Sequence, residues 1–353
     1  MKVVKLAALL SLLLSASVLL DALNVLCASL RAGDSPYVTL RPGLDFRMNV
    51  STEQTAMKTK YKTNSLGLRG KDIEKAKRKD EIRILCMGDS CTFGIGGWVG
   101  DTETYVKLFE KQMKNKYPSE DITAIDGGVP GYSSFQGLEL LKILLDEYSP
   151  DVVTVYFGWN DHWVDVFTDR EKKLVNTVDL YLDRSVIYTL VKRLANSNNA
   201  PARTIRYSSI WYRLNPDRRV RVSLPQYEEN LALMAKLCRA RGIKMVIFTA
   251  PSCDSKAVPG EGWFTQQPFY TFQLHSRYNE TARGTARKEG ISLFDLDAAL
   301  DRQPGRERLF ADFSHLSRQG HALTAELLAG YFVKERIIDE AVRNRETRAR
   351  ERI

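Results

Sequence analysis

The chain has 353 residues, 44% of them hydrophobic, which is enough for a sizeable core in one large domain or two small ones. Its formal net charge is +9, but 52 basic residues are interspersed with 43 acidic ones, so a mixed-charge surface is favoured over nucleic-acid binding. The five cysteines are too scattered for a disulfide framework, although one isolated bridge stays open. No zinc-type Cys/His spacing occurs, and neither a metal nor another cofactor is expected.

The N-terminus predicts export. Lys2 and Lys5 precede an apolar run over residues 6–20, which is typical of an export signal. The run continues more weakly, so residues 1–30 are either a cleaved signal peptide or a retained membrane anchor. Lysines before the run indicate that the body lies on the periplasmic or extracytoplasmic side. Residues 31–80 are interpreted as an N-terminal arm that ends in a charged, solvated turn or helix.

A short apolar run over residues 82–87 breaks into Gly88, Asp89 and Ser90. Such a run, ended by glycine, is typical of a central strand covered on both faces. A hydroxyl just beyond it lies at the carboxyl edge of a sheet, where open α/β folds collect ligands, so Ser90 is a candidate nucleophile. Gly-Asp-Ser is also ordinary turn chemistry, and a second copy at residues 33–35 follows no strand and is interpreted as a loop.

Two more strands are predicted at residues 121–126 and 152–156, after helices over 104–116 and 135–147. This alternation implies parallel strands with right-handed crossovers, and therefore a doubly wound sheet whose loops gather at one edge. Ser90, Gly131 and Asn160 would meet there.

Residues 162–225 interrupt the pattern and are predicted to be an insertion, a helical lid near the site. The pattern then resumes, within a domain expected to span residues 81–333. The tail, residues 334–353, is predicted to be a charged, solvated helix. The later elements are helices over 226–241, 272–289 and 322–333 and strands over 244–249 and 291–295.

Acyl transfer by a serine needs a base, a carboxylate that orients the base, and donors for the oxyanion. Only four histidines are present. His315 lies in a predicted loop three residues after Asp312 and is the preferred base, while His162 follows the third strand closely and is the reserve. His275 and His321 fall in or beside predicted helices, where solvated or capping roles are expected.

Four ordered blocks make the chain resemble the SGNH or GDSL-type hydrolases. They are Gly88-Asp89-Ser90, Gly128-Val-Pro-Gly131, Gly158-Trp-Asn160-Asp161 and Asp312-Phe-Ser-His315. The resemblance implies a three-layer α/β/α sandwich with a mainly parallel, flavodoxin-like sheet. It also implies Ser90 as nucleophile, His315 as base and Asp312 as the orienting carboxylate. The implied oxyanion donors are the backbone N–H groups of Ser90 and Gly131 and the side chain of Asn160.

Two residues depart from the family pattern, Trp159 and Leu316, and they bear on pocket shape rather than on the chemistry. The resemblance implies an exported serine esterase or acyl hydrolase acting on carboxylic esters, acetyl esters of carbohydrates among them, through an acyl-serine intermediate. A polysaccharide O-acetyltransferase and a non-catalytic carbohydrate-binding protein are the alternatives. The expected partner is a small-molecule ester or an acylated glycan, with membrane anchoring through the N-terminal segment left open.

Overall fold

The computed structural model describes residues 45–52, 55–95, 99–165, 167–173, 219–253 and 272–350. The chain divides into two compact units, of which one comprises residues 1–36 and 164–219 and the other residues 37–163 and 220–353. The second unit holds the sheet and the candidate site. Two-residue strands, β6 (Val164–Asp165) and β7 (Arg219–Val220), lie near the two ends of the predicted insertion, whose residues 166 and 174–218 lie outside the described part of the chain.

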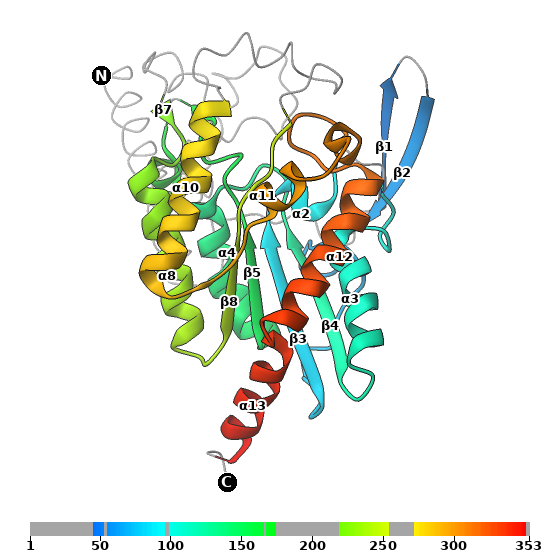
Figure 1. Ribbon diagram of the computed structural model, residues 1–353, viewed down its shortest axis with the longest axis vertical. Helices are drawn as coiled ribbons and strands as arrows, with labels where there is room; N and C mark the ends of the chain where they lie inside the picture. The colour runs from blue at the N-terminus through cyan, green and yellow to red at the C-terminus, as the bar shows by residue number, and fades with distance from the viewer. Residues whose placement is uncertain are drawn as a thin grey trace, which may run out of the picture. The chain divides into compact units, whose positions relative to one another are not determined.

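The central sheet has five parallel strands in the order β4-β3-β5-β8-β9 (Figure 1). In chain order this is the flavodoxin-like arrangement, in which the first strand lies between the second and the third. The predicted doubly wound sheet is therefore confirmed. The strands are β3 (Glu81–Gly88), β4 (Asp121–Gly128), β5 (Val152–Tyr156), β8 (Lys244–Phe248) and β9 (Ser292–Phe294).

The register of the sheet brings three loops to the same level. Gly88, the last residue of β3, pairs with Gly128 in β4 and with Tyr156 in β5. Since the strands are parallel and end together, the loops that follow them start side by side at the carboxyl edge. All residues of β3 and β5 are buried, as expected for central strands covered on both faces.

Helices cover both faces of the sheet and complete the three-layer sandwich (Figure 1). Alternate residues of β3 point to opposite faces, so Ile84 packs into one core cluster and Leu85 into the other. One face carries α3 (Tyr105–Lys116), α12 (Arg318–Lys334) and α13 (Ile337–Arg350), and the other carries α4 (Ser134–Tyr148), α8 (Leu224–Arg239) and α10 (Phe272–Glu289). Shorter elements are α2 (Ser90–Phe93), α11 (Leu296–Asp301) and the 3₁₀ helix η1 (Arg306–Leu309).

Hydroxyl caps set the helix starts, and they explain where the predicted bounds are wrong. The Ser317 hydroxyl accepts the Gly320 N–H and begins α12 four residues before the predicted start. Ser223 forms a capping box with Gln226 and begins α8 two residues early. The helices predicted over residues 104–116, 135–147 and 272–289 agree with α3, α4 and α10 to within one residue at each end.

The N-terminal arm has one element beyond its prediction, and its charged run forms mostly exposed bends and a turn, the first of the two predicted alternatives. It contains an antiparallel hairpin, β1 (Asp45–Thr52) and β2 (Thr55–Lys62), which the sequence analysis did not predict. The charged run before β3 forms no helix. Instead, the guanidinium of Arg83, only 1% exposed, donates to the backbone carbonyls of Glu74, Lys75 and Ala76 at 2.7–3.2 Å and holds this run against the sheet.

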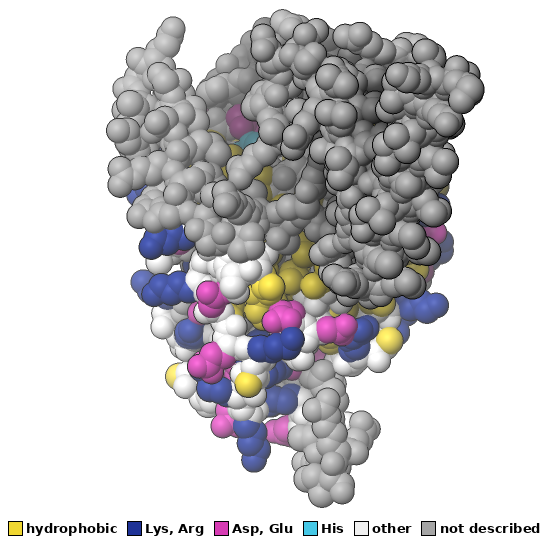
Figure 2. Space-filling view, turned by 180° about the vertical axis from the view of Figure 1, so that it is seen from behind, with side chains coloured by type: hydrophobic (Ala, Val, Ile, Leu, Met, Phe, Trp, Pro, Cys, Tyr) yellow, Lys and Arg dark blue, Asp and Glu magenta, His cyan; other side chains and the backbone are white. Residues whose placement is uncertain are grey.

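The C-terminal tail forms α13, but its first turns are not solvated. Ile337, Ile338 and Ala341 are buried in the same core cluster as α3 and α12. No helix in the described ranges is long and apolar enough to span a membrane. The predicted signal or anchor, residues 1–30, lies outside those ranges. On the face drawn in Figure 2, Lys and Arg side chains of the described residues lie beside Asp and Glu side chains, which is the mixed-charge surface that the composition predicts.

Candidate active site

Ser90 lies where the sequence predicts it, at the carboxyl edge of the sheet. The chain leaves β3 at Gly88 and turns at once into the four-residue helix α2, with Asp89 as its cap and Ser90 as its first residue. A Cβ atom on Gly88 would lie 2.0 Å from Thr92 Oγ1. Only glycine therefore allows the helix to fold back so closely on the strand that carries it.

Three side chains from two distant loops form a continuous hydrogen-bonded chain. Ser90 Oγ lies 2.8 Å from His315 Nε2, and His315 Nδ1 lies 2.7 Å from Asp312 Oδ2. The other carboxylate oxygen of Asp312 accepts the backbone N–H groups of Ser314 and His315, at 2.9 and 2.8 Å. The side chains of His315 and Asp312 are 19% and 26% exposed, so a substrate can reach them.

The pKa of His315 is raised and the pKa of Asp312 is lowered, so both shifts favour the charged form of each group. Burial alone would lower the pKa of His315, but the hydrogen bond and charge of Asp312, and the charge of Asp89, raise it overall. Burial alone would raise the pKa of Asp312, but the hydrogen bond and charge of His315 and the two backbone N–H groups lower it overall. The pair can therefore accept the proton of a serine hydroxyl.

Asn160 is tied to the residue next to Ser90. Its side-chain amide donates to Asp89 Oδ2 at 3.0 Å, while Asp89 Oδ1 accepts the Cys91 N–H at 2.8 Å. Asp89 is only 1% exposed, and burial raises its pKa. The sequence analysis gave Asp89 no role. Its buried carboxylate nevertheless joins the loop after β5 to the start of α2.

Gly131 lies in the loop between β4 and α4, in the left-handed region at φ +81. Its carbonyl accepts a hydrogen bond from Arg221 at 2.8 Å, and the other terminal nitrogen of Arg221 donates to Gln136 Oε1 at 2.6 Å. Asp161 ties the same loop to the one after β5, because Oδ1 accepts the Ser134 N–H at 3.0 Å. Arg221 falls in the predicted insertion, where no motif could have revealed it.

The other histidines do not contact Ser90 Oγ. His162 Nε2 lies 2.9 Å from His275 Nδ1, and His275 Nε2 lies 2.7 Å from the Ala250 carbonyl. Burial lowers the pKa of His162 well below its ordinary value and that of His275 to about 4. The expected solvated role of His275 is therefore wrong, and His162 is not placed to act as the base.

His321 is buried rather than solvated, and it caps the start of α3 rather than of its own helix. It lies in the first turn of α12, where its Nδ1 accepts the Tyr105 N–H at 3.1 Å. Burial lowers its pKa to about 3, so it is neutral at ordinary pH.

Cys91, directly after Ser90, is a buried free thiol whose sulfur donates to the Ser314 carbonyl at 3.4 Å. Burial raises the pKa of Cys91 well above the ordinary value, so the group stays a protonated thiol, which is a poor nucleophile. The other described cysteines are free and buried as well.

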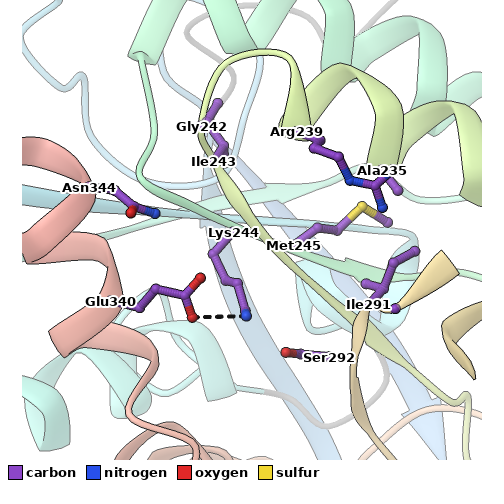
Figure 3. A pocket seen from close by; sticks show the side chains of 11 residues that line it. Ala235, Arg239, Gly242, Ile243, Lys244, Met245, Ile291, Ser292, Glu340 and Asn344 are labelled. Atoms are coloured by element: carbon purple, nitrogen blue, oxygen red, sulfur yellow. Dashed lines mark ion pairs between the residues drawn. The ribbon is translucent and has the colours of Figure 1, made fainter. Parts of the chain in front are cut away.

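One described cavity lies away from these groups. It has a volume of about 260 Å³ and is lined by residues around the starts of β8 and β9, at the edge of the sheet opposite Ser90 (Figure 3). Lys244 and Glu340, both in its lining, form an ion pair at 2.9 Å. This pocket is therefore separate from the candidate site. Among the described residues, no group of three or more His, Cys, Asp or Glu side chains is arranged to hold a metal ion.

Comparison with solved structures gives three examples of similar proteins, all at low identity. A lipase/acylhydrolase from Enterococcus faecalis is 18% identical, with 71% of this chain and 95% of that chain covered and a TM-score of 0.44. A GDSL-like lipase from Parabacteroides merdae is 16% identical, with 72% and 96% covered and a TM-score of 0.45. An acetylxylan esterase from Geobacillus stearothermophilus is 17% identical, with 70% and 92% covered and a TM-score of 0.42. At these values the similarities carry no argument about substrate.

Two comparisons of sequence identify similar proteins. An arylesterase of Vibrio mimicus is 31% identical over 85 residues, which are 22% of this chain and 38% of that relative. The matched part is thus well under half of the relative's length. The model of the GDSL-like lipase/acylhydrolase family matches residues 86–323, which is well over half of the chain. The chain therefore belongs to the GDSL-like lipase/acylhydrolase family.

Proposed function

We propose that the chain is an exported serine esterase that cleaves carboxylic esters through an acyl-serine intermediate, with Ser90 as nucleophile. One observation carries this proposal: the unbroken chain of hydrogen bonds from Ser90 Oγ through His315 to Asp312, with distances of 2.8 and 2.7 Å. A serine hydroxyl, an imidazole and a carboxylate in this order are the parts that acyl transfer requires.

Asp312 determines which nitrogen of His315 is the base. Because Oδ2 of Asp312 accepts a hydrogen bond from the N–H at Nδ1, the unprotonated Nε2 faces the hydroxyl of Ser90. As Oγ attacks the ester carbonyl, its proton passes to Nε2 and the carbonyl oxygen becomes an oxyanion. Asp312 then stabilises the imidazolium without taking the proton.

Three donors are proposed for the oxyanion. The NH₂ group of Asn160 carries two hydrogens, and Asp89 accepts one of them, which leaves the second for the substrate. The N–H of Ser90 opens α2 and has no acceptor within the helix, and the N–H of Gly131 comes from the neighbouring loop. Removal of one donor from such a site typically costs about 10²–10³ in kcat.

The remaining steps reuse His315. The oxyanion collapses, the bond to the leaving alcohol breaks, and Nε2 returns its proton to the alcohol oxygen. Nε2 then removes a proton from water as the water oxygen attacks the acyl carbonyl. When the bond between Ser90 Oγ and the acyl carbon breaks, Nε2 returns that proton to Oγ and restores the free hydroxyl. Acid and alcohol are the products, and no cofactor enters the balance.

Small acetyl esters, including those of carbohydrates, are the proposed substrate class. An aryl acetate is the first test substrate, because the relative from Vibrio mimicus is named an arylesterase. Export is supported by Lys2 and Lys5 ahead of the apolar run over residues 6–20. Cell fractionation followed by intact-mass measurement distinguishes a cleaved signal from a retained anchor, and full-length protein in the cytosol would refute export.

The test is turnover of p-nitrophenyl acetate by the wild type and by S90A. We expect S90A to lose turnover while its thermal unfolding midpoint stays unchanged, because the hydroxyl is removed without a cavity in the core. Residual turnover near that of the wild type would overturn the assignment. The same assay with an acetylated glycan, or with a glycan alcohol as acceptor, shows whether water or a sugar takes the acyl group.

A further inference from the structure

Trp159 replaces the small residue that the resemblance leads one to expect in the third block, and the structure shows where its side chain goes. The indole is 5% exposed and stacks on the imidazole of His275, with ring centroids 3.7 Å apart and planes at 14°. It also contacts the ring of Phe313 edge-on, at 5.2 Å and 71°, and the imidazole of His162 at 5.4 Å and 52°. Trp159 therefore lies between α10 and the loop that carries Asp312 and His315.

The residues after β8 hold both sides of this stack. Trp159 Nε1 donates to the Pro251 carbonyl at 3.1 Å, and the Cys253 N–H donates to the Phe313 carbonyl at 2.9 Å. The Asn279 side chain binds both the N–H and the carbonyl of Ala250, at 2.8 and 2.9 Å, and so fixes the start of this segment. One short stretch of backbone thus connects the two loops.

Hydrogen bonds also fix the ring beneath the indole. Since the acceptor at His275 Nε2 is the Ala250 carbonyl, that nitrogen carries the proton, and Nδ1 accepts from His162 Nε2. The His275 ring therefore has a defined tautomer and orientation, and burial keeps it neutral at the pH of an esterase assay. Trp159 rests on a support that does not titrate.

We propose that Trp159 is a positioning residue that joins the two catalytic loops. It holds the Asn160 amide where it can donate to the oxyanion and the His315 imidazole where it can take the proton of Ser90. The inference rests on the proposed function of Ser90. Asn160 follows Trp159 directly, and Phe313 lies between Asp312 and His315, so movement of the indole displaces donor and base together. Neither effect requires the indole to touch the substrate.

The consequences differ from those of a purely structural role. Loss of alignment lowers kcat, because a misplacement of about 1 Å can cost about 10²-fold, while KM for a small ester changes little. The contact between Asp312 and His315 also loosens. Since Asp312 and Asp89 are the carboxyl groups that raise the pKa of His315, the acid limb of the kcat/KM profile moves to lower pH.

The experiment uses W159A and W159F of the full chain, with active sites counted by a fluorophosphonate probe and p-nitrophenyl acetate as substrate. We expect W159A to lose about 10²-fold in kcat per labelled site and to shift the acid limb downward. W159F keeps a ring between His275 and Phe313 and should recover most of the kcat. W159A removes a buried ring and can unfold the chain. F313L therefore tests the same stack a second time, because Phe313 is only half-buried and its replacement costs less stability.

Phe332→Leu is the matched control. Phe332 is a buried ring that packs edge-on against Phe109 at 4.8 Å, near the end of α12 far from His315. F332L should lower the unfolding midpoint and leave kcat per labelled site and the pH profile unchanged. If folded W159A or F313L behaves like F332L, the inference is overturned while the role of Ser90 stands. If wild-type Ser90 neither reacts with the probe nor turns over ester, the proposed function and this inference both fail.

Discussion

Substitution of Asp89 by asparagine should reduce activity through Asn160 rather than through the fold. The two carboxylate oxygens of Asp89 accept two different donors, the Cys91 N–H at 2.8 Å and the Asn160 side chain at 3.0 Å. An asparagine at this position has one acceptor oxygen, so one of the two donors loses its partner in either orientation of the new amide.

The size of the effect follows from that lost contact. A hydrogen bond to a charged group contributes about 1.5–3 kcal/mol. Each 1.36 kcal/mol corresponds to a factor of ten in rate, so we expect kcat/KM to fall about 10- to 100-fold. Asp89 also raises the pKa of His315, so its replacement should move the acid limb of the profile to lower pH.

A double-mutant cycle tests whether Asp89 acts through Asn160. Hydrolysis of p-nitrophenyl acetate is measured for D89N, N160A and the double variant, with unfolding midpoints recorded in parallel. If Asp89 acts by orienting the Asn160 amide, D89N costs little in the N160A background. Fully additive losses, or a loss explained by a lower folded fraction, would refute the reasoning.

Three further outcomes are expected. In D312N, the pKa of His315 should fall, because its main raising partner is lost, and kcat/KM should drop by about 10⁴; a pH profile like that of the wild type would contradict this. R221K cannot bind Gly131 and Gln136 with two nitrogens at once, so kcat should fall about ten-fold at unchanged stability, and unaltered kcat would remove Arg221 from the site. His321 has a folded pKa of about 3 against an ordinary 6.5, so the unfolded chain binds more protons between these values and stability falls as pH falls through that window. H321N should flatten the slope of unfolding free energy by up to about 1.4 kcal/mol per pH unit there, as measured by denaturant titration, and an unchanged slope would count against a neutral, buried His321.

Local signals in the sequence were enough to predict the parallel sheet and the loops that follow its first three strands. Strands β3 and β4 end at glycine, and the β-branched run of β5 ends two residues before Gly158, a pattern that depends only on neighbouring residues. Because parallel strands must end at one edge, the prediction that loops distant in sequence meet also followed.

Other features could not be read from local pattern. The sequence of β1 alternates polar and apolar residues over residues 45–50, but the two residues between β1 and β2 are Glu53 and Gln54, not the Asn-Gly or Asp-Gly that is the strongest hairpin signal. The contact of His275 with His162 joins residues 113 positions apart and arises only from packing of α10 on the sheet. The apolar run predicts a helix that starts just after His321, whereas the Ser317 cap begins α12 at Arg318 and places His321 within its first turn.

The same limit applies to the residues that support the site. Asp89 and Asp161 stand in recognisable blocks, yet their partners, Asn160 and Ser134, are fixed by the fold. Trp159 was visible as a departure from the family pattern, but its position between His275 and Phe313 needs three segments in place at once. Sequence therefore indicated the reacting groups better than the groups that orient them.

The most direct test of the central claim is the site of covalent labelling by a fluorophosphonate, read by peptide mass spectrometry. The wild type should carry one adduct, on the peptide that contains Ser90, and labelling and ester turnover should disappear together in S90A. The adduct should be placed on the serine and not on Cys91, since burial raises the pKa of that thiol well above its ordinary value. Labelling at another residue, or turnover that survives in S90A, would contradict the account.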